Sequence, residues 1–188
     1  MSYKVTSQPS VEPVTLAEAK NWLKVIGTTD DSLISMLIES TRQTLEDRLD
    51  LKFITQTVVQ KLDKWPANSI EFNLETYPVQ SVTSIEYKTG SGTATFSTSQ
   101  YTADTTRQPA RIYLNEGATW PTLKAEQEAV SITFIAGYGD SADDVPVKLK
   151  QLLLHLLAYA YENRMNPINE RVTYIDKLVH LHRNFTFE

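Results

Sequence analysis

Residues 70–88 read IEFNLETYPVQSVTSIEYK, and this stretch carries the clearest fold signal in the chain. Apolar and polar side chains alternate at its start and again after Pro78, a period of two that is typical of β-strands with one buried face. The same alternation recurs in three further segments, residues 55–62, 111–114 and 130–135. We therefore expect a small, mostly antiparallel sheet within residues 53–139, with the glycine-rich stretch 90–92 as a hairpin turn.

In the residues before position 53, the apolar side chains recur with the spacing of an α-helix. A first helix is expected to begin at Thr15, because Thr15 and Glu18 have the spacing of a capping box. Its inward stripe would consist of Leu16, Ala19, Leu23 and Ile26. Gly27 is the expected stop, since glycine often follows the last helical turn.

A second helix is expected to begin at Asp30 and Asp31, whose carboxylates suit the positive end of a helix dipole. Its apolar stripe would consist of Leu33, Ile34, Leu37, Ile38, Thr41, Leu45 and Leu49. The charged residues that fall mainly off this stripe are Glu39, Arg42, Glu46 and Asp47. We expect this helix to pair with the first as a hairpin.

A third helix is expected from Val145 and Pro146, because proline is tolerated in a first helical turn, and to end near Asn166. Its apolar face would consist of Leu149, Leu152, Leu153, Leu156 and Ala160. A fourth helix is expected over residues 171–182. Because the third helix is the most hydrophobic element, we place it at the centre of a helical core.

These elements predict an α+β fold with about four helices. The helical core would cover residues 14–50 and 145–182, and a small β insertion at residues 53–139 would lie between the second and third helices. Residues 183–188 would form a C-terminal tail, and residues 1–188 a single domain.

The composition limits the function. The formal net charge is −5, which argues against a dedicated nucleic-acid binder, because phosphate binding depends on Lys and Arg. Without cysteine there is neither a disulfide nor a thiolate nucleophile. The longest apolar stretch, residues 152–161, is about half the ~20 residues of a membrane span, so no membrane partner is expected.

No residue pattern indicates an enzyme or a cofactor. Neighbours two apart on a helix point in different directions, which argues against a metal pair at His180 and His182. His155 is better explained as a structural or interface residue. The acidic pairs at residues 30–31 and 143–144 stand at expected helix starts, where capping accounts for them.

Two aromatic features leave alternatives open. Trp65 and Trp120 suit a β-domain core, but exposed they would suit a non-catalytic module that binds sugar or peptide. Phe185 and Phe187 alternate with polar residues at the end of the chain. Since exposed apolar surface is usually covered, this tail either folds back or docks on another subunit.

Several segments, in this order, resemble the head–tail connector or adaptor proteins of long-tailed phages and gene transfer agents. They are VTLAEAKNWL (14–23), DDSLI (30–34), EDR (46–48), YPVQSVTSI (77–85), WP (120–121), VSITFIAGYG (130–139), VP (145–146) and YENR (161–164). Their order and spacing carry the resemblance.

The resemblance implies a structural virion protein of the neck, made in the host cytoplasm. Such proteins assemble as a homo-oligomeric ring, expected here as a dodecamer, that docks on the portal protein and extends the DNA channel. They join the capsid to a downstream neck or tail protein, while DNA passes without sequence-specific binding. Arg183, Phe185 and Phe187 are the expected portal contacts. The exposed faces of the first and third helices and the edges of the β insertion are candidate contacts between copies.

Overall fold

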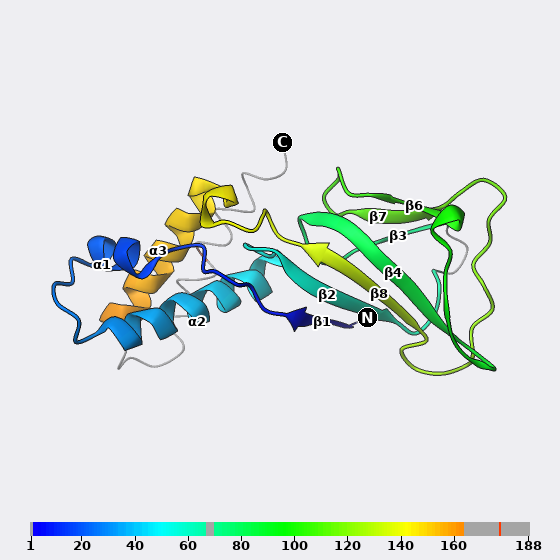
Figure 1. Ribbon diagram of the computed structural model, residues 1–188, viewed down its shortest axis with the longest axis horizontal. Coiled ribbons are helices and arrows are strands. Elements are labelled where there is room, and N and C mark those ends of the chain that lie inside the picture. Colours follow the sequence, from blue (N-terminus) through cyan, green and yellow to red (C-terminus); the bar gives the residue numbers. More distant parts are fainter. Residues whose placement is uncertain (1, 67–69, 164–176, 178–188) are drawn as a thin grey trace. The chain divides into compact units, whose positions relative to one another are not determined.

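The computed structural model describes residues 2–66, 70–163 and 177 (Figure 1). The chain forms two compact units. One, which we call the β unit, consists of Met1–Ser10 and Asp50–Asp140. The other, the helical unit, consists of Val11–Leu49 and Ser141–Glu188. The chain therefore passes from one unit to the other three times, after residues 10, 49 and 140.

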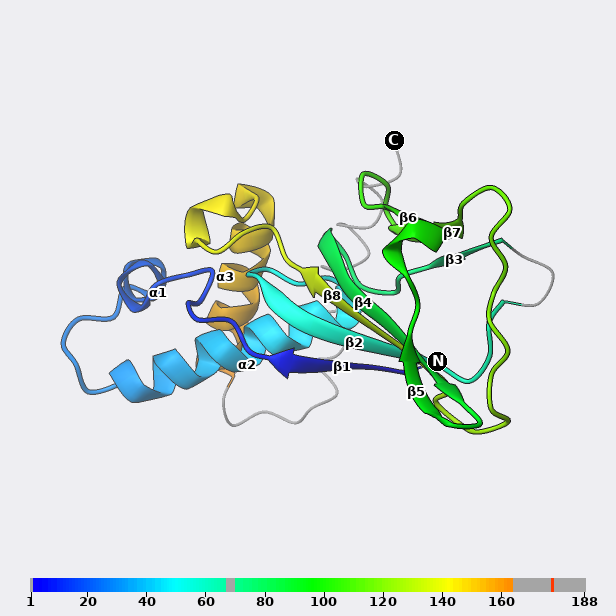
Figure 2. The same cartoon turned by 45° about the vertical axis from the view of Figure 1, so that its right-hand side comes forward.

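Two antiparallel sheets form the β unit. The larger has the order β1 (Ser2–Ser7), β2 (Gln56–Leu62), β8 (Val130–Ala136), β4 (Val79–Thr89), β5 (Gly92–Thr95). The smaller has the order β3 (Glu71–Asn73), β7 (Arg111–Leu114), β6 (Tyr101–Asp104), and a single 3₁₀ turn, Thr98–Gln100, precedes β6. Figure 2 shows the short strand β5 alongside the end of β4, with which it forms the hairpin expected around residues 90–92.

The core of the β unit depends on strict alternation in the two central strands. Every second residue of β2 and of β8 is buried, and Val58 of β2 stands opposite Phe134 of β8 in the antiparallel register. Both sheets contribute to a single hydrophobic cluster. Its buried members are Val58, Leu62, Phe72, Leu74, Val79, Ile85, Phe96, Tyr101, Ala110, Ile112, Val130, Ile132, Phe134 and Ala136.

The two ends of the segment Asp50–Asp140 lie against one another, and their backbones come very close. At Gly137, which has φ +131°, an added Cβ would lie 2.5 Å from the backbone carbonyl of Ile54. Backbone hydrogen bonds connect these two ends: the Thr55 N–H donates to Gly139 O at 2.9 Å, and the Tyr138 N–H donates to Phe53 O at 3.1 Å. Burial here raises the pKa of Tyr138 to about 12. Only glycine fits at position 137.

Three helices are described in the helical unit, α1 (Leu16–Leu23), α2 (Asp31–Leu49) and α3 (Val147–Glu162). The predicted capping box is confirmed: the Glu18 N–H donates to Thr15 Oγ1 at 3.2 Å, and Glu18 Oε2 accepts from the Thr15 N–H at 2.7 Å. The apolar face predicted for α3 is buried. The helix begins two residues after Val145, with Pro146 as its N-cap, and it ends before Asn166.

The predicted end of the first helix is wrong. α1 stops at Leu23, and Lys24 takes the left-handed conformation with φ 58°, so the chain leaves the helix before Gly27. Val25 and Ile26 are β-branched, which disfavours another helical turn. As a result Ile26, expected to point inward, is 98% exposed.

The predicted fold class is also wrong. The described residues form three helices and two antiparallel sheets of eight strands, with a β-rich core in place of a helical core bearing a small insertion. The reason is that the strands build a complete core between two sheets, and β1, which precedes all the helices, belongs to it. The expected fourth helix at residues 171–182 lies outside the described residues, except for Lys177.

Candidate assembly interface

The carboxylate pairs support local structure. Asp31 forms an ion pair with Lys20 at 2.5 Å, and Asp30 accepts a hydrogen bond from the Tyr161 hydroxyl at 2.5 Å. Asp144 accepts from the Ser141 N–H at 2.9 Å, within a capping box of the short 3₁₀ helix Ala142–Asp144. These contacts give Asp30, Asp31 and Asp144 structural roles.

Metal binding finds no support in residues 2–66, 70–163 and 177, where no three His, Asp or Glu side chains gather around a possible ion site. The candidate metal residues His180 and His182 lie outside that part of the chain. Across the helices that are described, none combines the length and the apolar composition needed to cross a membrane.

The two β-region tryptophans stack on one another. The ring centroids of Trp65 and Trp120 lie 4.6 Å apart with an interplanar angle of 15°, and Trp65 Nε1 donates to Pro121 O at 2.8 Å. Both rings also contact Phe96. This half-buried cluster packs against the β core, as the core interpretation predicted, and no observation favours a sugar-binding platform.

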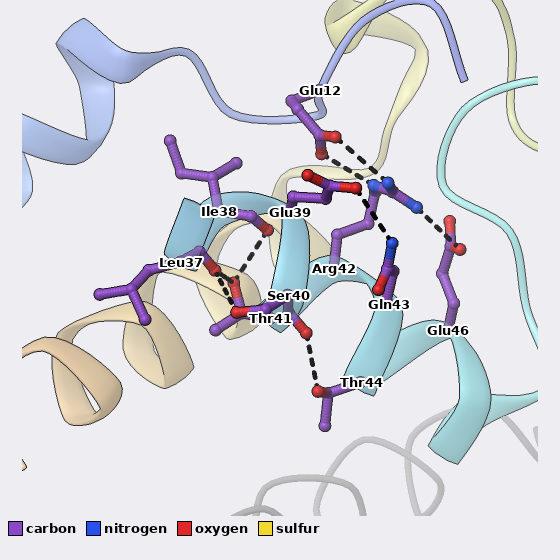
Figure 3. A network of polar contacts seen from close by, with 10 residues as sticks. All are labelled: Glu12, Leu37, Ile38, Glu39, Ser40, Thr41, Arg42, Gln43, Thr44 and Glu46. Atoms are coloured by element: carbon purple, nitrogen blue, oxygen red, sulfur yellow. Dashed lines mark hydrogen bonds and ion pairs between the residues drawn. The ribbon is translucent and has the colours of Figure 1, made fainter. Parts of the chain in front are cut away.

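Arg42, expected on the polar side of α2, is buried with only 1% of its surface exposed (Figure 3). Its Nε and Nη2 donate to Glu12 at 2.7 and 3.2 Å, and its Nη1 donates to Glu46 at 3.1 Å. Burial opposes the charge of Arg42, but the hydrogen bond that it donates to Glu12 and the negative charges of Glu46, Glu12 and Glu39 outweigh burial and raise the pKa of Arg42. Glu12, Arg42 and Glu46 thus form a triad. It attaches Glu12, which lies close to where the chain enters the helical unit, to α2.

The loop between α1 and α2, residues 24–30, is held at both ends. Lys20 Nζ donates to Gly27 O and pairs with Asp31, while Tyr161 of α3 holds Asp30. The Val25 N–H donates to Lys20 O at 3.0 Å. Hydrogen bonds to Val25, Gly27 and Asp30, with the Lys20–Asp31 pair across the base of the loop, thus tie the loop to α1 and α3.

This loop and the end of α1 present apolar side chains to solvent. Trp22 is 41% exposed and Ile26 is 98% exposed. The Trp22 ring packs edge-on against His155 of α3, with centroids 5.3 Å apart, and a shallow hollow lies between Trp22, Lys24 and neighbouring residues. We call Trp22, Lys24 and Ile26 the knob.

A second exposed apolar site lies where α3 begins. Val147 is 79% exposed, the adjoining Pro146 is exposed, and the Asp143 side chain is 98% exposed. We call Asp143, Pro146 and Val147 the α3 start. The other exposed large hydrophobic residues of the described chain are Val11, Met36 and Ile70, and of these only Ile70 belongs to the β unit.

The residues expected to contact the portal, Arg183, Phe185 and Phe187, lie outside the described residues. Sequence reasoning included the exposed face of the first helix among the candidate contacts, but it missed Ile26 because it assigned that residue to a buried stripe. The available signal was the β-branched pair Val25 and Ile26 directly before Gly27 and two threonines, a composition more typical of a loop than of a helix end.

Comparison with known proteins gives one family match. The sequence model of the family described as phage gp6-like head-tail connector protein matches residues 13–110, which lie in both units. No curated protein matches the chain significantly.

Solved structures with a similar fold come from gene transfer agent (GTA) particles. A chain from the neck of an empty GTA particle computed with C6 symmetry has a TM-score of 0.75 at 22% identity, covering 89% of this chain and 87% of that one. A chain from the virion of a native GTA particle has a TM-score of 0.75 at 21% identity, with the same coverage. A chain from the neck of a native GTA particle computed with C12 symmetry has a TM-score of 0.68 at 24% identity, covering 87% and 86%. At these identities the likeness establishes the fold.

Proposed function

Because this chain belongs to the phage gp6-like head-tail connector family, we propose that its copies form a ring that docks on the portal and extends the DNA channel towards the tail. Membership makes the protein a structural connector of the head–tail interface and not an enzyme. The ring would hold twelve copies and would present the surface on which the next neck or tail protein docks. It would act by geometry, without turnover.

The observation that carries this proposal is the family match over residues 13–110, which spans all of α1 and α2 and most of the β unit. The fold shared with neck chains of six- and twelve-fold symmetric reconstructions supports a ring. The match enters both units, so we propose that residues 1–188 act as one connector domain. A net charge of −5 suits a channel wall that DNA must pass without adhering.

Electron microscopy of the purified chain mixed with its portal tests the ring. We expect an additional ring of density on the portal, with twelve copies counted by native mass spectrometry. The portal alone is the control. Portal images that stay unchanged at saturating concentrations of the chain would refute the proposal, whereas a monomer in the absence of portal would not, because the ring can depend on the portal for assembly.

We further propose that Arg183, Phe185 and Phe187 contact the portal. The alternating aromatic tail has the pattern of a strand that could add to the edge of a partner sheet. Deleting residues 183–188 should leave a folded protein, judged by circular dichroism, that no longer sediments with portal. The matched control replaces only Thr186 by alanine and should bind as before. Unchanged binding by the deletion variant would remove this contact from the proposal.

A further inference from the structure

We propose that the knob of one copy, formed by Trp22, Lys24 and Ile26, packs against the α3 start of the next copy, formed by Asp143, Pro146 and Val147. This inference rests on the ring proposed above and identifies the surfaces that would join its neighbours. Both surfaces belong to the helical unit, so each lies on a single compact body.

The apolar residues at these two surfaces are unusually exposed. Ile26 and Val147 are 98% and 79% exposed, the two highest values among the large hydrophobic residues of the described chain. Trp22 adds a half-exposed indole beside a shallow hollow. Tryptophan is enriched among the residues that dominate binding energy at protein interfaces.

The knob is also preorganised. The contacts of Lys20 with Gly27 and Asp31, and of Tyr161 with Asp30, fix the loop in the free chain. A surface that is already ordered loses little conformational entropy when it binds, so a larger share of its buried apolar area contributes to affinity.

The two surfaces meet α3 at different points along its length, since Trp22 of the knob packs against His155 in the middle of the helix. Tyr161 near the C-terminal end of α3 contacts the loop that carries Ile26, whereas Val147 is the first residue of the helix. Val147 and Tyr161 are separated by fourteen steps along the helix, which is about 21 Å at 1.5 Å per residue. Figures 1 and 2 likewise show the yellow start of α3 well apart from the blue loop between α1 and α2. Two different, separated patches on each copy are what a closed ring of identical subunits requires.

Charge favours this pairing over contact between two knobs. Lys24 gives the knob an exposed cation, and Asp143 gives the α3 start an exposed carboxylate. Lys150 lies 3.8 Å from Asp143, too far for a strong hydrogen bond, and the Asp143 side chain is 98% exposed. Asp143 therefore remains accessible to a lysine of another copy, whereas two knobs would bring two Lys24 ammonium groups together.

The absence of cysteine allows a direct test by disulfide trapping. Copies carrying only Ile26→Cys are mixed with copies carrying only Val147→Cys, assembled on portal and oxidised. Both positions are exposed, so folding should be unaffected. A disulfide forms only when two Cα atoms lie within about 7 Å, so a 26–147 product requires the proposed contact. The matched control replaces Ile26→Cys by Ile70→Cys, an exposed isoleucine of the β unit.

We expect abundant dimers linked between residues 26 and 147, and few linked between residues 70 and 147. Reversing charge tests the same contact without cysteine: Lys24→Glu or Asp143→Lys alone should lower ring occupancy, and the two together should restore it. Rings seen by microscopy without the 26–147 dimer would overturn this inference and leave the proposed function intact. Failure of the wild-type chain to form rings would overturn the proposed function, and this inference with it.

Discussion

Arg42 is a charged side chain that the fold removes from water, and its two carboxylate partners are what make this possible. Glu12 receives two of its N–H groups and Glu46 a third, within hydrogen-bonding distance. A buried ion pair of this kind contributes little compared with a well-packed apolar core, but losing one partner leaves the other charge buried without compensation. The triad therefore makes the helical unit sensitive to single substitutions at this point.

Replacing Arg42 by alanine should lower the free energy of unfolding by about 3–5 kcal/mol, because Glu46 would remain buried without its cation. Urea denaturation followed by circular dichroism measures this. The double variant Arg42→Met with Glu46→Leu should recover much of the loss. Gln43→Ala, exposed on the same helix, is the control and should change stability by less than about 0.5 kcal/mol. Equal losses for the Arg42 and Gln43 variants would contradict the triad's role.

The capping box gives α1 a dependence on pH. The backbone N–H of Thr15, followed by its hydroxyl, donates to Glu18 and lowers the pKa of Glu18 below its ordinary 4.5. A lowered pKa means that the stabilisation is fully present above pH 4.5 and is lost as the pH falls through the folded value.

Glu18→Gln should therefore reduce stability near neutral pH, by at most about 1 kcal/mol at this exposed site, and the difference from wild type should shrink as the pH falls to about 3. Thermal unfolding of both proteins across that range measures the effect. Thr15→Ala removes only the hydroxyl donor and keeps the backbone N–H that donates to Glu18, so it should weaken the pH dependence without abolishing it. A wild-type-to-variant difference that stays constant with pH would argue against ionised Glu18 as the capping group.

Gly137 shows how the strand ends depend on a single missing methyl group. Gly137→Ala would place Cβ 2.5 Å from the Ile54 carbonyl at a φ of +131°, so we expect a loss of about 2–3 kcal/mol in the free energy of unfolding. Gly90→Ala is the control, because nothing lies within 4 Å of its Cβ position, and it should be nearly neutral. Chemical denaturation distinguishes the two. Similar stability for both variants would mean that the backbone relaxes easily at position 137.

Helices and strands that depend on neighbouring residues were predicted correctly from the sequence. Features that depend on contacts between distant segments were not. The alternation in residues 55–62 became β2, and the Thr15 cap began α1, since each depends on neighbours within a few residues. The sequence pattern did not show that β7 would face the five-stranded sheet or that β1 would join β2, because both depend on contacts between distant segments.

The candidate interface was less predictable than the fold. A helical stripe extended as far as Gly27 placed Ile26 inside, and a polarity rule placed Arg42 outside, yet the fold reversed both assignments. In each case the deciding contact comes from another segment: Lys20 and Tyr161 shape the loop around Ile26, and Glu12 neutralises Arg42. Such compensation is visible only after the chain has folded.

For the whole molecule, the excess of acidic residues predicts that the protein does not bind DNA non-specifically. With a net charge of −5 the protein should not retard duplex DNA in a gel-shift assay at physiological salt, because non-specific binding needs clustered Lys and Arg. Reversing three exposed acids, Asp47, Glu86 and Glu116, to lysine changes the net charge from −5 to +1, and this control should show weak binding. A wild-type shift of comparable strength would contradict a channel wall that lets DNA slide past.

The three passages of the chain between its units give the protein a redundancy that a single hinge would lack. A protease nick after residue 10, 49 or 140 leaves two uncut tethers, so the two bodies remain covalently attached. A nick after residue 10 would cut the covalent link of the β1 segment, but β1 would still be paired with β2 through backbone hydrogen bonds. In a particle that must survive outside a cell, one broken peptide bond at this boundary therefore does not separate the halves of a subunit.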